Sequence, residues 1–210
     1  MAGVAPGNVV VVGGGAAGSS AARIAAGMGA NVVILDNNSR RLNELDWMFQ
    51  GSVRVVHSNA ENIERYVIDA DIVVGSVLVP GASAPKLVTR AMVKKMRPGS
   101  VLVDIAIDQG GCFETSRPTT HENPTFVEED VIHYCVTNMP GAVARTSAVA
   151  LNNATLPFIM QLANKSPAKA LLENEHLMNG LNVCRGNITH TAVARDLGMD
   201  YVEPSRILAA

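Results

Sequence analysis

Apolar residues occur along this chain in short continuous runs separated by longer stretches of mixed character. Six runs have the length of strands, at residues 8–12, 31–36, 52–58, 71–78, 101–107 and 131–136. Strands that are covered on both faces of a parallel sheet have such runs, because neither face meets water. The run at 71–78 is expected to end near Gly75 and Ser76.

Segments with helical spacing lie between these runs, at residues 16–30, 39–50, 59–70 and 88–96. In the second segment we expect Ser39 as the N-cap and one apolar face made of Leu42, Leu45, Met48 and Phe49. Two loops rich in Pro, Gly and Thr are predicted at 79–87 and 108–126. Strands alternating with helices predict an α/β fold with a doubly wound parallel sheet of six strands, of the Rossmann type.

The pattern changes near Pro140 and becomes mainly helical. Helices are predicted at 145–163, 167–180 and 189–198, with only a brief strand-like stretch at 181–186. We therefore predict a doubly wound domain over residues 1–140 and an all-helical C-terminal appendage over residues 141–210.

Composition narrows the classes of function. The 210 residues carry a formal net charge of −2 and only 4% aromatic residues, so neither a basic surface nor a stacking platform for nucleic acid is expected. Three widely spaced cysteines argue against a disulfide framework and a zinc ribbon, and we expect no metal site. No apolar run reaches the ~20 residues of a membrane span, so a soluble cytoplasmic protein is the expectation.

A glycine-rich turn joins the first predicted strand to the first predicted helix. Gly13, Gly15 and Gly18 have the spacing G-x-G-x-x-G, in which the glycines permit a tight turn, a close approach to pyrophosphate and close helix packing. The free amides that follow, including those of Ala16 and Ala17, would face the phosphates. We predict a dinucleotide site here; the alternative is a packing turn without a ligand.

Asp36 ends the second predicted strand, 18 residues after Gly18. A carboxylate here can accept hydrogen bonds from the adenosine ribose and would repel a 2′-phosphate, which favours NAD over NADP. Arg40 and Arg41 keep the alternative open, because a guanidinium could meet such a phosphate. Asp108 is the one carboxylate directly at the end of a later strand, where ligands of such sheets bind, although a turn residue is the alternative.

Four segments together resemble alanine dehydrogenase: VVVVGGGAAGSSAARIAAGMGANVVILDNN, GSVLVPGASAPKLVT, MRPGSVLVDIAIDQGGCFETSRPTTHENPTF and HYCVTNMPGAVARTSAVALNNATLPF. The resemblance covers nearly the whole chain, from about Val4 to the C-terminus. The related proton-translocating transhydrogenases share the glycine loop but lack the CFET-RPTTH continuation, which argues against a transhydrogenase subunit.

The resemblance implies an NAD-dependent oxidoreductase that converts L-alanine, NAD and water to pyruvate, ammonia and NADH. It implies cofactor contacts from the loop Gly13–Gly18, Asp36 and Arg41 at the ribose, Ser58 on the adenine side, Val77 and Leu78 after the fourth strand, Ile105 and Asp108 near the nicotinamide, and Asn138 and Met139 above it. Asp108 matches the active-site aspartate of the family. A carboxylate there would stabilise the iminium cation that develops on alanine, help to position water, or accept a proton.

The family builds its substrate domain from two pieces, one on each side of the dinucleotide domain. Only eight residues precede Val9 here, so the resemblance implies that the Arg and Lys that grip the substrate carboxylate, and the His acid/base, are missing. His57, His121, His133, His176 and His190 do not fill that role by position; we expect a packed His133 and a solvated His121. The isolated chain is therefore expected to bind NAD and to be inactive alone, and a non-catalytic NAD sensor is the other interpretation.

The helices after Pro140 carry apolar residues with no evident partner. Leu156, Phe158, Ile159 and Leu162 are expected to form an exposed stripe, and such patches commonly mark interfaces. We expect this chain to self-associate through those helices or to need a complementing polypeptide.

Overall fold

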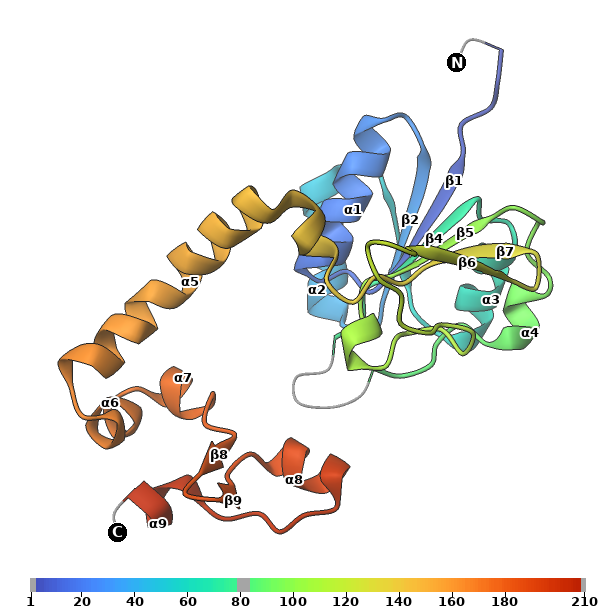
Figure 1. Cartoon of the computed structure of the whole chain (residues 1–210). Coiled ribbons are helices and arrows are strands. Elements are labelled where there is room, and N and C mark those ends of the chain that lie inside the picture. Colours follow the sequence, from blue (N-terminus) through green and yellow to red (C-terminus); the bar gives the residue numbers. More distant parts are fainter. Residues whose placement is uncertain (1–2, 79–83, 209–210) are drawn as a thin grey trace. The chain divides into compact units, whose positions relative to one another are not determined.

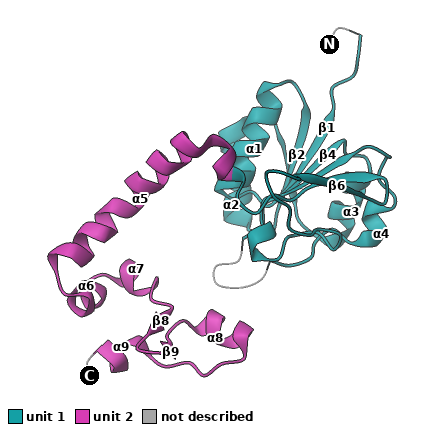
Figure 2. Cartoon of the chain, in the orientation of Figure 1, with its two compact units in different colours: residues 1–79, 83–139 teal, residues 80–82, 140–210 magenta. Residues whose placement is uncertain are grey.

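The computed structural model describes residues 3–78 and 84–208, which form two compact units (Figure 2). Described residues up to Met139 belong to the first unit, and those from Pro140 onward belong to the second. Of the loop predicted at 79–87, residues 79–83 lie outside the described residues.

A seven-stranded sheet forms the centre of the first unit (Figure 1). The strand order is β3-β2-β1-β4-β5-β7-β6, and every neighbouring pair is parallel except β6 with β7. The order reverses at β1, which confirms the predicted doubly wound α/β fold. The strands are β1 (Asn8–Val12), β2 (Asn31–Asp36), β3 (Arg54–His57), β4 (Ile72–Gly75), β5 (Val101–Asp104), β6 (Thr125–Glu128) and β7 (Val131–Tyr134).

The strand count differs from the predicted six, because β6 lies partly inside the segment predicted as a loop. It pairs antiparallel with β7 at the edge of the sheet, with Thr125 opposite Tyr134. The two strands are joined through Glu129 and Asp130, which both have positive φ (54° and 59°), as a tight hairpin turn requires. Four residues between a proline and an acidic turn carry little strand signal, so pairing with β7 decides this element.

Helices cover both faces of the sheet: α1 (Ala16–Gly27), α2 (Ser39–Phe49), α3 (Ala60–Ile68) and α4 (Arg90–Val93). The N-cap of α2 is Asn38 rather than the predicted Ser39, because the Asn38 side chain accepts the first free amides of the helix. Of the predicted apolar face, Leu45 and Phe49 are buried, whereas Met48 is 53% exposed. The fourth helix is also shorter than predicted.

Two apolar clusters, one on each face of the sheet, explain why β1 is a continuous valine run. Val10 and Val12 join a cluster with residues of α3 and α4, and Val9 and Val11 join another with residues of α1 and α2. Successive residues of a strand point to opposite faces, so both faces must be apolar when helices cover both.

The second unit is mostly helical: α5 (Ala144–Asn164), α6 (Pro167–Glu173), α7 (Glu175–Met178), α8 (Thr191–Leu197) and α9 (Pro204–Leu208). The prediction of an all-helical segment is wrong in one respect, because β8 (Val183–Cys184) and β9 (Asn187–Ile188) form a small antiparallel hairpin. Its turn has positive φ at Arg185 (48°) and Gly186 (78°).

Helix α5 has no buried residue. The four residues of the predicted stripe are 37% to 52% exposed: Leu156, Phe158, Ile159 and Leu162. In the described part of the chain, no helix combines the length and the apolar character needed to cross a membrane.

His133 of β7 is fully buried and makes two hydrogen bonds as a neutral ring. Nδ1 donates to the Val131 carbonyl oxygen (3.0 Å), and Nε2 accepts from the Thr115 hydroxyl (2.7 Å). The ring stacks on Phe126 with centroids 4.8 Å apart. Burial lowers the pKa of His133 below its usual value, so the folded chain resists protonation of this side chain.

The free energy of unfolding should therefore decrease as the pH falls below about 6.5, because the unfolded chain then binds a proton that the folded chain does not. The stability due to neutral His133 is fully present above that pH and is lost progressively toward the lower folded pKa. Thermal unfolding at pH 7.5 and 5.5 measures the loss, and His133→Gln should reduce it. An equal loss in both proteins would contradict this assignment.

Candidate functional site

The candidate site lies at the carboxyl ends of the parallel strands, where the strand order reverses beside β1 (Figure 1). Ligands of open α/β sheets bind at this point, because the loops from adjacent strands separate there. The glycine turn follows β1, Asp36 ends β2, and Ser76 follows β4. The topology thus brings residues that end or follow three different strands together at the carboxyl ends of those strands.

The three motif glycines have different steric surroundings. At Gly13 (φ +99°) a Cβ would lie 2.9 Å from the carbonyl carbon and oxygen of Ser76. At Gly18 a Cβ would lie 2.0 Å from the Gly13 carbonyl oxygen, so α1 can approach the strand end only without a side chain here. At Gly15 a Cβ would meet nothing within 4 Å. Gly13 and Gly18 are required by packing, whereas Gly15 has open space beside it as far as the described residues reach.

The N-terminus of α1 is left without a side-chain cap. Gly15 is the N-cap residue and supplies none, and the first turn contains no acidic residue. By contrast, Asn38 caps α2 and Asn59 caps α3. Ala16 and Ala17 are exposed. The amides of the first turn that have no partner among the described residues, together with the positive end of the helix dipole, are therefore available to an anion. These features fit the pyrophosphate of a dinucleotide.

Asp36 connects the end of β2 to the glycine turn. Its Oδ2 accepts from the Gly14 amide (2.8 Å), and its Oδ1 accepts from the Asn38 amide (2.9 Å). A carboxylate can accept about four hydrogen bonds, so two acceptor positions remain for the hydroxyls of a ribose. The half-buried Ser58 lies next to it, because its amide donates to the Asp36 carbonyl oxygen (2.8 Å).

Arg41 is already engaged by the chain itself. Its Nε donates to the Gly14 carbonyl oxygen (2.7 Å), and its guanidinium pairs with Glu44 (2.9 Å). The hydrogen bond from Arg41 lowers the pKa of Glu44, which keeps this partner charged. Arg41 therefore braces the glycine turn, an arrangement that favours NAD over NADP. Arg40 is far more exposed and also pairs with Glu44 (3.4 Å).

Residues that follow β4 and β5 extend the candidate site along the carboxyl ends of the strands. The Ser76 hydroxyl donates to the Gly13 carbonyl oxygen (2.8 Å), and Val77 packs against the core while Leu78 is exposed. Ile105 follows β5, and its amide donates to the Gly75 carbonyl oxygen (2.8 Å). These contacts fix the backbone at the predicted nicotinamide end of the site.

Asp108 lies in a short 3₁₀ turn, η1 (Ile107–Gln109), so the predicted strand 101–107 ends early. Its side chain is exposed and makes no hydrogen bond or ion pair with any residue that the structure describes. A carboxylate with free acceptor positions at this edge can meet a cation, a water or a proton. Beside it, the buried Oε1 of Gln109 also has no partner among the described residues.

The residues after β7 are linked to the predicted loop. Asn138 is exposed and Met139 is half-buried, and Met139 begins a second 3₁₀ turn, η2 (Met139–Val143). His121 is exposed, as the sequence predicts, but its Nε2 hydrogen-bonds to the Asn138 carbonyl oxygen (2.7 Å). His121 therefore supports the Asn138 segment instead of standing free in solvent.

Asp104, the last residue of β5, was not among the site residues predicted from the sequence. It is fully buried, and its carboxylate accepts from the amides of Cys112 (2.9 Å) and Phe113 (3.3 Å) and from the Ser116 hydroxyl (2.6 Å). A Cβ at Gly111 (φ +77°) would lie 2.6 Å from Asp104 Oδ2. An acidic residue inside an apolar strand was the available signal, since buried carboxylates need several donors.

Asp104 and Lys86 hold the segment that follows Asp108. The Lys86 ammonium donates to the carbonyl oxygens of Gly110 and Phe113, the latter at 3.2 Å. Burial, with the Asp104 charge adding to it, raises the pKa of the Cys112 thiol to about 11. The Cys112 thiol is therefore protonated near neutral pH and is unsuited to act as a nucleophile.

Gly15→Ala and Gly18→Ala form a matched pair of substitutions at the turn. Gly18→Ala should destabilise the fold by about 1–3 kcal/mol, because its Cβ collides with backbone. Gly15→Ala should leave the melting temperature unchanged and weaken NADH binding about tenfold or more, because its Cβ would enter the space where we expect the pyrophosphate. Calorimetric melting and NADH titration separate the two effects. Unaltered NADH affinity in Gly15→Ala would contradict this placement.

Comparisons with known proteins agree with this geometry. The sequence model of the family "Alanine dehydrogenase/PNT, C-terminal domain" matches residues 1–191. The chain is 56% identical to an alanine dehydrogenase of Halomonas elongata over 206 residues, 98% of this chain and 56% of that protein. It is 55% identical to an alanine dehydrogenase of Staphylococcus saprophyticus over 202 residues, 96% of this chain and 54% of that protein. The chain spans about half the length of the curated relatives it matches.

Solved structures give the same result. An L-alanine dehydrogenase superposes with a TM-score of 0.84 at 48% identity, covering 94% of this chain and 55% of that chain. A transhydrogenase from Sinorhizobium meliloti gives 0.63 at 27% identity, covering 70% of this chain and 42% of that chain. The resemblance to alanine dehydrogenase and the prediction of NAD as the cofactor are confirmed. The chain belongs to the alanine dehydrogenase/PNT C-terminal domain family.

Proposed function

We propose that this chain supplies the NAD-binding part of an L-alanine dehydrogenase, which converts L-alanine, NAD and water to pyruvate, ammonia and NADH. The observation that carries the proposal is the uncapped N-terminus of α1 beside Asp36, in a chain 55–56% identical to alanine dehydrogenases. Bound NAD would supply the hydride acceptor. The chain's own residues would bind NAD, orient it and polarise the reacting groups.

The contacts described above assign each part of the cofactor to residues at the carboxyl end of a different strand. The first-turn amides of α1 would hold the pyrophosphate, with Ala16 and Ala17 exposed beside it. Asp36 would hold the adenosine ribose in a turn braced by Arg41, and Ser58 would lie on the adenine side. The nicotinamide end would lie against residues that follow β4, β5 and β7: Val77, Leu78, Ile105, Asn138 and Met139.

Asp108 is the proposed catalytic residue. Its carboxylate is exposed, lacks a partner among the described residues and lies directly before a segment held by Asp104 and Lys86. Positive charge develops on the substrate nitrogen as alanine is oxidised, and a nearby carboxylate stabilises that charge. The same oxygens can orient the attacking water or receive its proton. A fixed segment matters because electrostatic stabilisation depends on preorganised groups.

We assign residues 1–140 to NAD binding and residues 141–210 to part of a substrate domain. A polypeptide of these 210 residues is expected to bind NADH with little turnover, because it spans about half the length of its dehydrogenase relatives. The exposed residues of α5 would be covered by a second copy or a complementing polypeptide. Three free cysteines fit a reducing compartment, and we propose the cytoplasm.

Calorimetry with NADH tests the cofactor site. Asp36→Ala should weaken NADH binding about tenfold or more, since it removes charge-assisted hydrogen bonds to the ribose. Asp36→Gly combined with Asn37→Arg should shift the preference toward NADPH. Asp46→Ala, an exposed aspartate on α2, is the matched control and should bind like the wild type. No heat of binding with the wild-type chain would refute the proposal.

A steady-state assay with L-alanine and NAD tests the chemistry. The 210-residue polypeptide alone should oxidise L-alanine slowly or not at all, because substrate orientation and proton transfer contribute many orders of magnitude to the reaction rate. When the remaining half of a dehydrogenase relative is supplied and restores turnover, Asp108→Asn should lower kcat at least about a hundredfold while NADH affinity stays near that of the wild type.

Robust turnover by the isolated polypeptide would refute the expected inactivity, and unchanged kcat in Asp108→Asn would refute the role of Asp108. Tight NADH binding that no complementing half converts into turnover would favour a non-catalytic NAD-binding module instead. Hydride exchange with NADP(H), together with a membrane fraction, would favour a transhydrogenase-type subunit.

A further inference from the structure

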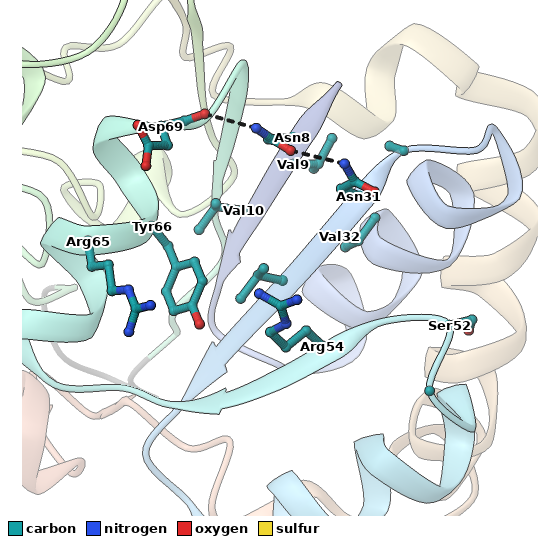
Figure 3. A pocket seen from close by; sticks show the side chains of 13 residues that line it. Asn8, Val9, Val10, Asn31, Val32, Ser52, Arg54, Arg65, Tyr66 and Asp69 are labelled. Atoms are coloured by element: carbon teal, nitrogen blue, oxygen red, sulfur yellow. Dashed lines mark hydrogen bonds between the residues drawn. The ribbon is translucent and has the colours of Figure 1, made fainter. Parts of the chain in front are cut away.

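A second candidate site lies at the amino ends of the strands, whereas the glycine turn lies at their carboxyl ends. A cavity of about 550 Å³ opens at the amino ends of β1, β2 and β3, beside the last turn of α3 (Figure 3). Its volume is in the range of small-molecule sites in proteins. The glycine turn and Asp36 follow the carboxyl ends of the same strands, so this cavity is separate from the cofactor site.

The cavity combines apolar and hydrogen-bond-donating surfaces. Val10, which is buried, and the half-buried Val33 supply apolar lining from β1 and β2. Arg54 from β3 faces Arg65 and Tyr66 from α3, and Figure 3 shows Tyr66 between the two arginines with the polar ends of all three turned toward one space. A ligand there would meet hydrogen-bond donors around its polar group and valine methyl groups beside its apolar part.

No ion pair within residues 3–78 and 84–208 neutralises the positive charge in this cavity. Neither Arg54 nor Arg65 forms an ion pair within the described residues, although Asp69 also lines the cavity. Figure 3 shows the Asp69 carboxylate at the far end, away from both guanidinium groups. Two guanidinium groups against one distant carboxylate leave an excess of positive charge. The Tyr66 ring lies 5.6 Å from the Arg65 guanidinium carbon, a distance at which the two attract.

The rim of the cavity is held in place by hydrogen bonds. Asn31 Nδ2 donates to Asn8 Oδ1 (3.2 Å), and Asn8 Nδ2 donates to the Asp69 carbonyl oxygen (3.2 Å). The dashed lines in Figure 3 follow these two bonds from β2 through β1 to Asp69, the residue after α3. The opening is therefore formed before a ligand arrives, which reduces the entropy lost on binding.

We propose that this cavity binds a small organic anion, in which a carboxylate or phosphate group is joined to a compact apolar body. A guanidinium presents parallel N–H donors that match two oxygens of either group. The Tyr66 hydroxyl adds a donor, and Val10 and Val33 contact the apolar body. This proposal does not depend on the function assigned to the cofactor edge.

Amide NMR of the 210-residue chain tests the proposal with phenyl phosphate and benzoate as probes, and the two arms separate phosphate from carboxylate. At least one anion should cause saturable shifts at the amides of residues 8, 31, 54, 65 and 66, and the neutral benzyl alcohol should not. Saturating NADH keeps the anions off the glycine turn. The amides of residues 14–18 report that site separately, so a failure of NADH binding would remain distinguishable.

Arg54→Gln and Arg65→Gln should each weaken binding of the active probe about tenfold, as expected for loss of a charge-assisted hydrogen bond. Arg23→Gln removes an exposed arginine on α1 and should leave the affinity unchanged, which controls for net charge. The proposal is overturned by a lack of saturable shifts at these five amides, by equal shifts with benzyl alcohol, or by undiminished affinity in both variants.

Discussion

The close approach of α1 to the carboxyl end of β1 is the constraint on which the cofactor edge depends. A Cβ at Gly18 would lie 2.0 Å from the Gly13 carbonyl oxygen, so this approach exists only because the residue is glycine. The approach aims the free amides of α1 at the sheet edge, where Asp36 binds the Gly14 amide. The phosphate-binding and ribose-binding groups are therefore fixed to each other through one turn, and a shift of the helix would displace both.

Two aspartates four residues apart show how surroundings decide what a carboxylate does. Asp104 is fully buried, and the amides of Cys112 and Phe113 together with the Ser116 hydroxyl satisfy it. Removing donors from a buried carboxylate is costly, so this group anchors the chain. Asp108 is exposed and has no such donors among the described residues, which leaves its oxygens available for chemistry. The first holds the segment that follows the second.

Most of the first unit could be predicted, because a strand that is buried on both faces of a sheet has a continuous run of apolar residues. The bounds of β1 and β2 match the valine-rich runs, since each apolar residue there belongs to or packs against one of two apolar clusters. The hairpins β6–β7 and β8–β9 were not fully predicted. Their short strands β6, β8 and β9 have no long apolar run, and they depend on a pairing partner and on turn residues at positive φ, such as Asp130 and Arg185.

By itself, the sequence determined the doubly wound class, the glycine turn and the acid that ends β2, because these are set by local spacing and by the period of burial. Only the tertiary structure decided that Arg41 binds the Gly14 carbonyl oxygen, that Asp104 faces inward, and that Arg54 and Arg65 share a cavity. These contacts join residues that are apart along the chain. Spacing reports which residues share a helix face or a strand face, whereas long-range contacts arise only when the elements pack together.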